Sequence, residues 1–251
     1  MVDVLGWRMK FGVIAPSTNT SVEPEYARLQ PRGVTNHFSR VTIPDNPVTD
    51  NDSFVALVEN IRAATIAAID SVMSCSPGHI IMGMSAETFW DGARRADRLQ
   101  KEFADAAGVG VTIGSHACQA AIAAYRKDTP IKTVAVLTPY MPIGDDMVER
   151  FFRDIGLDVL GVYGLKSPSP MLIAHETAER LRQVTLELDK LKPDAIIQAG
   201  TNLVYSHIAP EAERWLGKPV IAINTATYWH ALRSVGINDQ IPGYGRLLSH
   251  H

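Results

Sequence analysis

Short apolar runs alternate with longer amphipathic stretches along the whole chain. The apolar runs are rich in β-branched residues and predict buried strands at residues 11–15, 80–84, 109–113, 134–137, 157–163, 195–198 and 219–223. The stretches between them repeat apolar residues at helical spacing and predict helices at residues 52–73, 92–106, 117–125, 144–155, 173–191 and 226–234. This alternation is typical of parallel sheets covered by helices.

The second part of the chain repeats the first. The segment KFGVIAP at 10–16 is echoed by KTVAVLTP at 132–139, HIIMGM at 79–84 by AIIQAG at 195–200, and VTIGSHA at 111–117 by VIAINTA at 220–226. Because the three matches keep the same order, we expect an α/β fold of two pseudo-symmetric, Rossmann-like parallel-sheet halves. The active site is expected in the cleft between them, where equivalent strand ends face each other.

The repeat also predicts where the halves divide. A chain of 251 residues can form one large domain or two small ones. We expect the first α/β half at residues 1–115, with the C-terminal segment 226–251 packing back on it, and the second half at residues 116–225.

Small polar residues follow the predicted strands. Ligands of parallel sheets bind beyond the carboxyl ends of the strands, and helices that begin there present backbone N–H groups that favour anions. The phosphate-binding patterns GxGxxG and GxxxxGK[ST] are absent, so a carboxylate is expected rather than a nucleotide. The candidate binding residues are Ser17, Asn19, Tyr140, Ser85, Ala86, Thr201, Asn202, Asn224 and Thr225.

Composition narrows the class of protein. The formal net charge of −3 gives no electrostatic case for nucleic acid or an acidic membrane surface, and no apolar run reaches transmembrane length. No secretion signal is visible at the N-terminus. The two cysteines, Cys75 and Cys118, do not suggest a disulfide framework, and no CxxC or HExxH spacing indicates a metal site. We expect a soluble cytoplasmic protein with no nucleic-acid, membrane or metal partner.

A family resemblance lies on these strand ends. The segment GVIAPSTNT at 12–20, with Glu23 and Glu25 after it, resembles the opening of maleate cis-trans isomerases. Further matches are PYM at 139–141, GKPV at 217–220, TAT at 225–227 and PGYG at 242–245, so the resemblance covers about residues 8–249. This group belongs to the aspartate/glutamate racemase superfamily, with arylmalonate decarboxylases as close relatives.

The resemblance implies a fold, a ligand and an assembly. It implies two pseudo-symmetric halves, no cofactor and a small carboxylate substrate, with Asn19 and Tyr140 holding a substrate carboxylate. By the same analogy the protein is expected to be a homo-oligomer, either a dimer or a dimer of dimers, and a two-fold dimer is the commonest soluble assembly.

The resemblance also implies a pair of cysteines that this chain lacks. Family isomerases and racemases carry one cysteine after the second strand of each half, and arylmalonate decarboxylases keep only the second. Those positions are Met84 and Gly200 here, while Cys75 precedes the strand and Cys118 lies in the helix after the third strand. A thioether or a hydrogen atom cannot supply thiolate chemistry. A register shift of two residues would bring Ala86 to the first position.

Three side chains are candidates for moving a proton. Glu87 is the carboxylate nearest to the missing first cysteine, His116 titrates near neutral pH, and Tyr140 can donate through its hydroxyl. Each has an ordinary structural alternative: Glu87 complements a helix dipole, His116 caps a helix, and Tyr140 packs its ring. Asn19 has the alternative of an N-cap, and a TSVE run at 20–23 fits a capping box.

These residues predict an enzyme that acts on a small mono- or dicarboxylate through an enolate-like intermediate held by backbone donors. By resemblance it is an isomerase, but without the two-cysteine mechanism. Two alternatives stay open: a decarboxylase or other lyase of a malonate-type acid, and a non-catalytic carboxylate-binding homologue. Acid–base groups with strongly shifted ionisation in the cleft would favour an enzyme.

Overall fold

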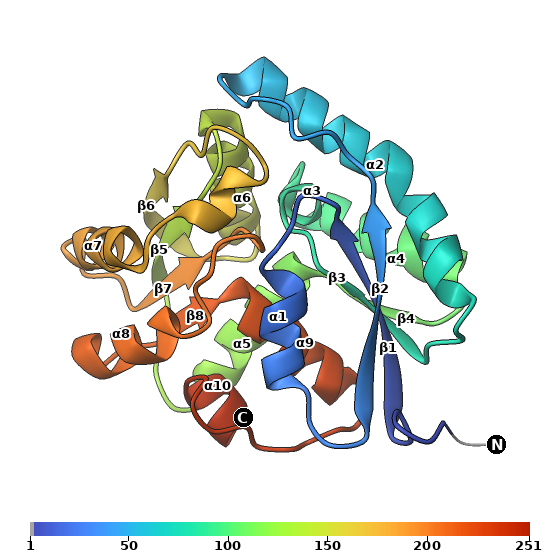
Figure 1. Ribbon diagram of the computed structural model, residues 1–251. Helices are drawn as coiled ribbons and strands as arrows, with labels where there is room; N and C mark the ends of the chain where they lie inside the picture. Colours follow the sequence, from blue (N-terminus) through green and yellow to red (C-terminus); the bar gives the residue numbers. More distant parts are fainter. Residues whose placement is uncertain (1–2) are drawn as a thin grey trace.

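Two four-stranded parallel sheets form the centre of the protein in a computed structural model that describes residues 3–251 (Figure 1). The first sheet has the order β2-β1-β3-β4, with β1 Met9–Pro16, β2 Val34–Val41, β3 His79–Met82 and β4 Gly110–Thr112. The second has the order β6-β5-β7-β8, with β5 Thr133–Thr138, β6 Asp158–Gly164, β7 Ala195–Gln198 and β8 Val220–Ala222.

The two sheets repeat one topology. Each strand of the first sheet has a counterpart at the same place in the second, and every strand pair is parallel. The echoed sequence segments form β1 and β5, β3 and β7, and β4 and β8. The predicted α/β fold of two parallel-sheet halves is therefore confirmed.

Helices separate the sheets from solvent and from each other. In the first half, α2 and α4 pack on one face of the sheet, and α1 and α9 pack on the other (Figure 1). In the second half, α6 packs along β6, while α7 and α8 pack against each other over the sheet. The bounds are α1 Val22–Leu29, α2 Asn51–Met73, α3 Ala86–Phe89, α4 Ala93–Ala107, α5 Gly114–Tyr125, α6 Pro142–Asp154, α7 Ala178–Asp189, α8 Ile208–Leu216, α9 Ile223–Ser234 and α10 Arg246–His250.

Two equivalent helices join the halves. Helix α5 follows β4, α9 follows β8, and the two pack against each other at the centre of the molecule (Figure 1). Small residues such as Ala117, Ala121 and Ala226 are fully buried there, which lets the helix backbones approach closely. One core cluster contains apolar side chains from both sheets, so the two halves are packed as one body, and a second, smaller cluster lies within the second half.

The apolar pattern missed some elements and merged others. Strand β2 lies at the edge of its sheet and most of its side chains are half-buried, so its sequence VTNHFSRV shows no apolar run. The helices α1, α3, α8 and α10 were not predicted because all four are short. The helix predicted at 173–191 is split, because Thr177 accepts a hydrogen bond from the Arg180 N–H and starts α7, leaving a 3-10 turn at Leu172–His175 before it.

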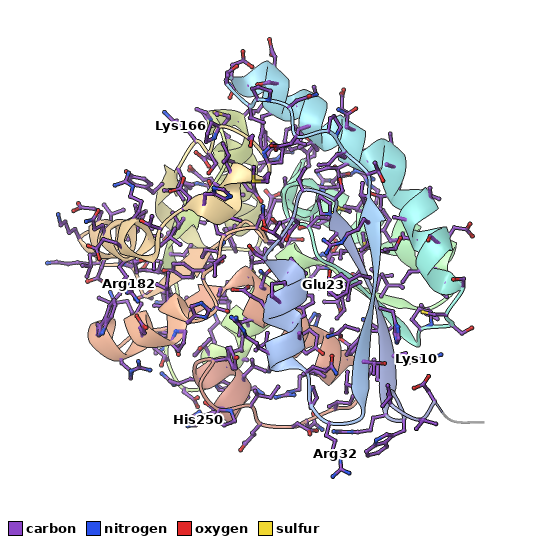
Figure 2. The ribbon with its side chains drawn as sticks, in the orientation of Figure 1. Lys10, Glu23, Arg32, Lys166, Arg182 and His250 are labelled. Atoms are coloured by element: carbon purple, nitrogen blue, oxygen red, sulfur yellow. The ribbon has the colours of Figure 1, made fainter. Side chains whose placement is uncertain are left out.

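Charged side chains gather on the outside of the molecule. The labelled residues Arg32, Lys166 and Arg182 lie at the periphery in Figure 2, away from the centre where the two sheets approach each other. Within residues 3–251, no helix is both long and apolar enough to cross a membrane.

Candidate active site

One cavity lies where the carboxyl ends of the four central strands meet. It is bordered by the loops that follow β1, β3, β5 and β7, and by one face of α2. Its lining residues are Pro16, Thr18, Asn19, Ile43, Phe54, Leu57, Ile61, Met84, Ser85, Ala86, Glu87, Pro139, Tyr140, Pro170, Ile173, Gly200, Thr201 and Asn202. Residues predicted separately from the two halves are thus brought together around one space.

Hydroxyl groups from three loops meet at this cavity. Ser85 Oγ lies 2.6 Å from Tyr140 Oη, and the backbone N–H of Thr201 donates to Ser85 Oγ at 3.0 Å. Thr201 Oγ1 in turn donates to the carbonyl of Gly83 at 3.2 Å. The equivalent loops after β3 and β7 therefore hold each other in place across the boundary between the halves.

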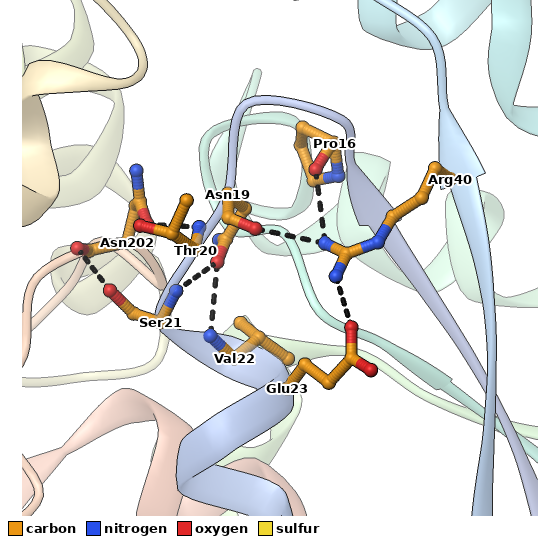
Figure 3. Close-up of polar contacts among 8 residues, drawn as sticks. All are labelled: Pro16, Asn19, Thr20, Ser21, Val22, Glu23, Arg40 and Asn202. Carbon is orange, nitrogen blue, oxygen red and sulfur yellow. Dashed lines mark hydrogen bonds and ion pairs between the residues drawn. The ribbon is translucent and has the colours of Figure 1, made fainter.

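Asn19 both caps a helix and reaches across the boundary. Its Oδ1 accepts the N–H groups of Ser21 and Val22, each at 3.0 Å, so Asn19 caps the start of α1 (Figure 3). Its Nδ2 donates to Thr201 Oγ1 at 3.2 Å. The predicted capping box at 20–23 is wrong: α1 has no such cap, and Glu23 pairs with Arg40 on β2.

Asn202 ties the second half to the start of α1. Its Oδ1 accepts the Thr20 N–H at 3.0 Å, and its carbonyl accepts the hydroxyl of Ser21 at 2.8 Å (Figure 3). Its Nδ2 donates to the carbonyl of Pro170 at 2.8 Å. From the other side, Arg40 donates to the carbonyl of Asn19 at 2.8 Å, which fixes the outer end of the same loop.

Several backbone donors in the lining are free, and Ala86 and Asn202 supply one from each half. The N–H groups of Ala86 and Asn202 make no hydrogen bond to any residue in the described part of the chain. An unpaired N–H in a buried site is costly unless a ligand or water accepts from it. Together with the hydroxyls of Ser85 and Tyr140, these donors can hold a carboxylate or an oxyanion.

One wall of the cavity is apolar. Phe54, Leu57 and Ile61 project from α2 at helical spacing, and the ring of Phe54 lies 5.2 Å from the ring of Tyr140. Ile43 and Ile173 extend this wall. Burial raises the pKa of Tyr140, so its phenol stays protonated and available as a donor.

Glu87 lines the cavity but is held by a cation. Its Oε1 and Oε2 accept from Arg62 Nε and Nη2 at 2.7 and 3.2 Å, and its side chain is only 1% exposed. Burial raises the pKa of Glu87, and Arg62 opposes that rise. The ion pair fastens α3 to α2, an arrangement that suits a structural carboxylate better than a free base.

Four other predicted site residues lie outside the lining. His116 is bound between Gln100 Oε1 at 2.8 Å and Asp97 Oδ1 at 3.0 Å, and burial lowers its pKa. Ser17 exchanges hydrogen bonds with the backbone of Ile43. Asn224 and Thr225 are buried at the start of α9, behind the cavity. The sequence shows which residues follow a strand, but it does not show which of their side chains face the cavity and which turn away from it.

The two positions of the family cysteines lie at the cavity, but they hold other residues. Within residues 3–251 no cysteine lines the cavity, whereas Met84 and Gly200 both do. Cys118 is fully buried in α5, and burial raises the pKa of its thiol to about 12. Gly200 has a φ of +122°, and a Cβ built on it would lie 2.4 Å from Cδ of Pro139. The second loop is therefore shaped around the lack of a side chain at residue 200.

Sequence reasoning missed one carboxyl group next to the cavity. Asp145, in the first turn of α6, accepts from the hydroxyl of Thr138, and Thr138 Oγ1 accepts the Tyr140 N–H at 3.1 Å. Burial raises the pKa of Asp145 to about 7. An acidic residue in a first helical turn usually complements the helix dipole, so the sequence carried no sign of this burial. No group of three or more His, Cys, Asp or Glu side chains in the described chain is arranged to hold a metal ion.

Comparisons with known proteins identify the family of the chain. A family model described as arylmalonate decarboxylase matches residues 11–248. The maleate isomerase of Pseudomonas putida is 24% identical over 252 residues, covering 96% of this chain and 97% of its own. The arylmalonate decarboxylase of Bordetella bronchiseptica is 27% identical over 170 residues, covering 66% and 69% of the two chains.

A solved structure extends the comparison to the fold. A mutant maleate cis-trans isomerase of Nocardia farcinica, which carries a covalently bound succinylcysteine intermediate, superimposes with a TM-score of 0.85. It is 20% identical, and the alignment covers 97% of this chain and 99% of that one. The two proteins share the fold of two parallel sheets over their whole length.

Proposed function

The chain belongs to the arylmalonate decarboxylase family, and from that premise we propose that it is a cofactor-independent enzyme acting on a small carboxylate through an enolate-like intermediate. Its relatives of known activity are maleate isomerases and arylmalonate decarboxylases, so its chemistry is isomerase or decarboxylase chemistry. The cavity between the two sheets supports a carboxylate as the ligand.

The polar side of the cavity holds the carboxylate that stays on the substrate. The hydroxyls of Ser85 and Tyr140 lie 2.6 Å apart, and Ala86 and Asn202, whose N–H groups are free, line the same cavity from the two halves. Negative charge that develops on this carboxylate as an enediolate forms is stabilised by the same donors, which are already in place.

Loss of carbon dioxide is the reaction that this geometry supports best. The C–C bond to a second carboxylate breaks against the apolar wall of Phe54, Leu57 and Ile61, and its electron pair enters the retained carboxylate as an enediolate. A proton then returns to carbon. The hydroxyl of Tyr140 borders the cavity and can donate it, and the phenolate left behind takes a proton from water before the next turnover. The observation that carries this proposal is a cavity that is lined by hydroxyl and amide donors and by apolar side chains and that has, among the described residues, no cysteine in its lining.

Isomerisation of a maleate-like diacid is the second candidate. It is favoured by the match to a maleate isomerase along nearly the full length of both chains. Without a thiol among the described lining residues, the double bond has to be weakened through the same enolate-like electron shift rather than through a cysteine adduct. A non-catalytic carboxylate binder would use the same donors and leave its ligand unchanged.

Proton NMR in deuterated water separates these functions. The purified protein is incubated with malonate, phenylmalonate and maleate. We expect phenylmalonate to give phenylacetate carrying one solvent deuteron at the α-carbon. Conversion of maleate to fumarate instead would favour the isomerase. Spectra unchanged for every acid, with binding seen by line broadening, would leave only the binder.

Tyr140 has a matched control for this assay. Tyr140→Phe removes a hydroxyl that borders the cavity, whereas Tyr205→Phe removes a buried hydroxyl that lies 2.5 Å from Thr185 Oγ1, away from the cavity. We expect Tyr140→Phe to lower turnover by about 100-fold and Tyr205→Phe to change it by less than about threefold. Equal effects of the two changes would argue against a role of Tyr140 in the reaction.

Two further predictions from the sequence stay predictions: a cytoplasmic location and a two-fold homo-oligomer. The predicted division at residues 115/116 and 225/226 also remains a proposal, and the packing of α9 on β3 and β4 of the first sheet supports it.

A further inference from the structure

The buried carboxylate of Glu25, outside the cavity, links α1 to α9 and to the segment that precedes α8. Glu25 lies on α1, is 2% exposed and accepts hydrogen bonds from residues of the second half and α9. Its Oε1 accepts the N–H of Ser206 at 3.2 Å and the hydroxyl of Ser206 at 2.6 Å, and its Oε2 accepts from Asn224 Nδ2 at 2.6 Å. No part of the proposed reaction uses this group.

Glu25 fixes the orientation of the Asn224 amide. Nδ2 of Asn224 donates to Glu25 Oε2 and also to the carbonyl of Thr201 at 2.8 Å. An amide nitrogen has two hydrogens, and both are used here. A carboxylate only accepts, so it requires the nitrogen rather than the oxygen of Asn224 at this point, and the same nitrogen then serves Thr201.

From Thr201 the contacts continue to the cavity. The N–H of Thr201 donates to Ser85 Oγ at 3.0 Å, and Ser85 Oγ lies 2.6 Å from Tyr140 Oη. An unbroken series of short polar contacts therefore runs from Glu25 through Asn224, Thr201 and Ser85 to Tyr140.

We propose that Glu25 is a positioning residue, which orients Asn224 and through it holds Thr201 and the carboxylate-binding hydroxyls in their binding geometry. Its catalytic meaning rests on the proposed function, but the positioning itself is a property of the free protein. The two halves are thereby coupled at the site by a group that never touches the substrate.

Glu25→Gln tests this because it changes hydrogen-bond polarity with almost no change of shape. If the introduced amide keeps its oxygen toward Ser206, its nitrogen faces Asn224 Nδ2, and two donors oppose each other. If Asn224 rotates to offer its oxygen instead, that oxygen faces the carbonyl of Thr201. In either arrangement the hydrogen bond from Asn224 to the Thr201 carbonyl is weakened or lost.

Ser206→Ala is the matched control. It removes the 2.6 Å hydrogen bond from the Ser206 hydroxyl to Glu25. The hydrogen bonds of Asn224 to Glu25 and to the Thr201 carbonyl stay in place. If Glu25 only stabilises the fold, Glu25→Gln and Ser206→Ala should change amide hydrogen exchange at Thr201 equally. If Glu25 positions Asn224, only Glu25→Gln should change it strongly.

Two readouts are taken at pH 8 to favour the ionised form, since burial raises the pKa of Glu25 while the hydrogen bonds from Ser206 and Asn224 oppose that rise. The first is amide hydrogen exchange at Thr201 in the free protein. We expect Glu25→Gln to accelerate it by about tenfold and Ser206→Ala by less than about twofold. Asn224→Ala removes the hydrogen bond to the Thr201 carbonyl directly, and it replaces Glu25→Gln in the test if that variant does not fold.

The second readout is the dissociation constant of phenylacetate, a monocarboxylate with no second carboxyl group to lose. We expect Glu25→Gln to weaken binding by about tenfold and Ser206→Ala to leave it within about twofold. Unchanged exchange at Thr201 in Glu25→Gln, or an equal change in Ser206→Ala, would overturn the positioning role. If the wild-type protein binds no carboxylate, the proposed function fails, and exchange at Thr201 still decides the role of Glu25.

Discussion

The loops after β3 and β7 occupy equivalent places in the two halves but are built for different tasks. The first loop presents a buried methionine, a hydroxyl and a free N–H to the cavity through Met84, Ser85 and Ala86. The second loop has a glycine with a φ of +122° and then Asn202, whose side chain hydrogen-bonds to Thr20 of the first half and to Pro170.

The difference shows how a duplicated fold can divide its work. In one copy of the loop the Ser85 hydroxyl borders the cavity, and in the other the side chain of Asn202 fixes the two halves against each other. The Ser85 and Thr201 contacts cross between the copies, so the geometry of the cavity and the alignment of the halves depend on each other.

The largest effect is expected when a cysteine is placed in each loop in turn. Gly200→Cys puts a Cβ against Pro139 at a positive φ and is expected to cost roughly 4 kcal/mol in the free energy of unfolding. Met84→Cys only removes volume and is expected to cost about 2 kcal/mol. Urea unfolding of both variants measures the gap. Equal costs would mean that the second loop is not shaped around glycine.

Removing one polar side chain from each loop tests whether the loop after β3 serves the reaction and the loop after β7 serves the stability of the fold. Asn202→Ala leaves the Thr20 N–H and the Pro170 carbonyl without partners and should lower the free energy of unfolding by about 3 kcal/mol. Ser85→Ala should cost only about 1 kcal/mol but abolish most phenylmalonate turnover. Urea titrations and the NMR assay compare them. If Ser85→Ala is the more destabilising variant, the two roles are reversed.

The strand ends beside the loops differ in charge, and pH tests that difference. Arg40 supports the end of β1, whereas the buried Asp145 lies beside the end of β5, with its pKa raised from 3.8 to about 7. Between these values the folded state binds more protons than the unfolded state, so this group makes stability fall as pH rises from about 4 to about 7.

Asp145→Asn removes that dependence. The variant should be more stable than the wild type at pH 8, by on the order of 2 kcal/mol, and the gain should shrink toward pH 4. Urea unfolding at pH 4.5, 6 and 8 tests this, with Asp146→Asn on the next residue as the control. A gain that does not vary with pH would contradict a raised pKa for Asp145.

The smallest effect is expected at Glu87. Because Arg62 holds its carboxylate, Glu87→Gln should cost about 1 kcal/mol and change turnover by less than about threefold. Glu102→Gln, which alters an exposed ion pair with Arg95, is the control. A fall in turnover of about 100-fold or more in Glu87→Gln alone would make Glu87 the acid or base of the reaction after all.

The two sheets and several residues of the candidate site could be predicted from the sequence, because both depend on local sequence pattern. Buried strands of a parallel sheet are continuous apolar runs, and their echo in the second half predicted both sheets and the place where their ends meet. Asn19, Ser85, Tyr140 and Thr201 follow these strands directly, and the structure gathers them at one cavity.

What the sequence could not supply depends on contacts between distant segments. Strand β2 gave no signal because its sequence VTNHFSRV is mostly polar and most of its side chains are only half-buried. Glu87 looked like a candidate base until the position of Arg62 on α2 was known, and His116 until Gln100 and Asp97 were placed around it. Glu25 and Asp145 are ordinary helix carboxylates in the sequence, and only tertiary burial sets them apart.

The most direct test of the account is turnover by a protein with no cysteine at all. Cys75→Ala with Cys118→Ala removes both thiols of the chain, neither of which lines the cavity. The double variant is assayed by proton NMR with phenylmalonate in deuterated water, at a temperature where circular dichroism shows it folded. We predict turnover within about threefold of the wild type, because the carboxylate is held by Ser85, Tyr140 and backbone N–H groups. Loss of turnover in the folded double variant would contradict thiol-free chemistry on this scaffold.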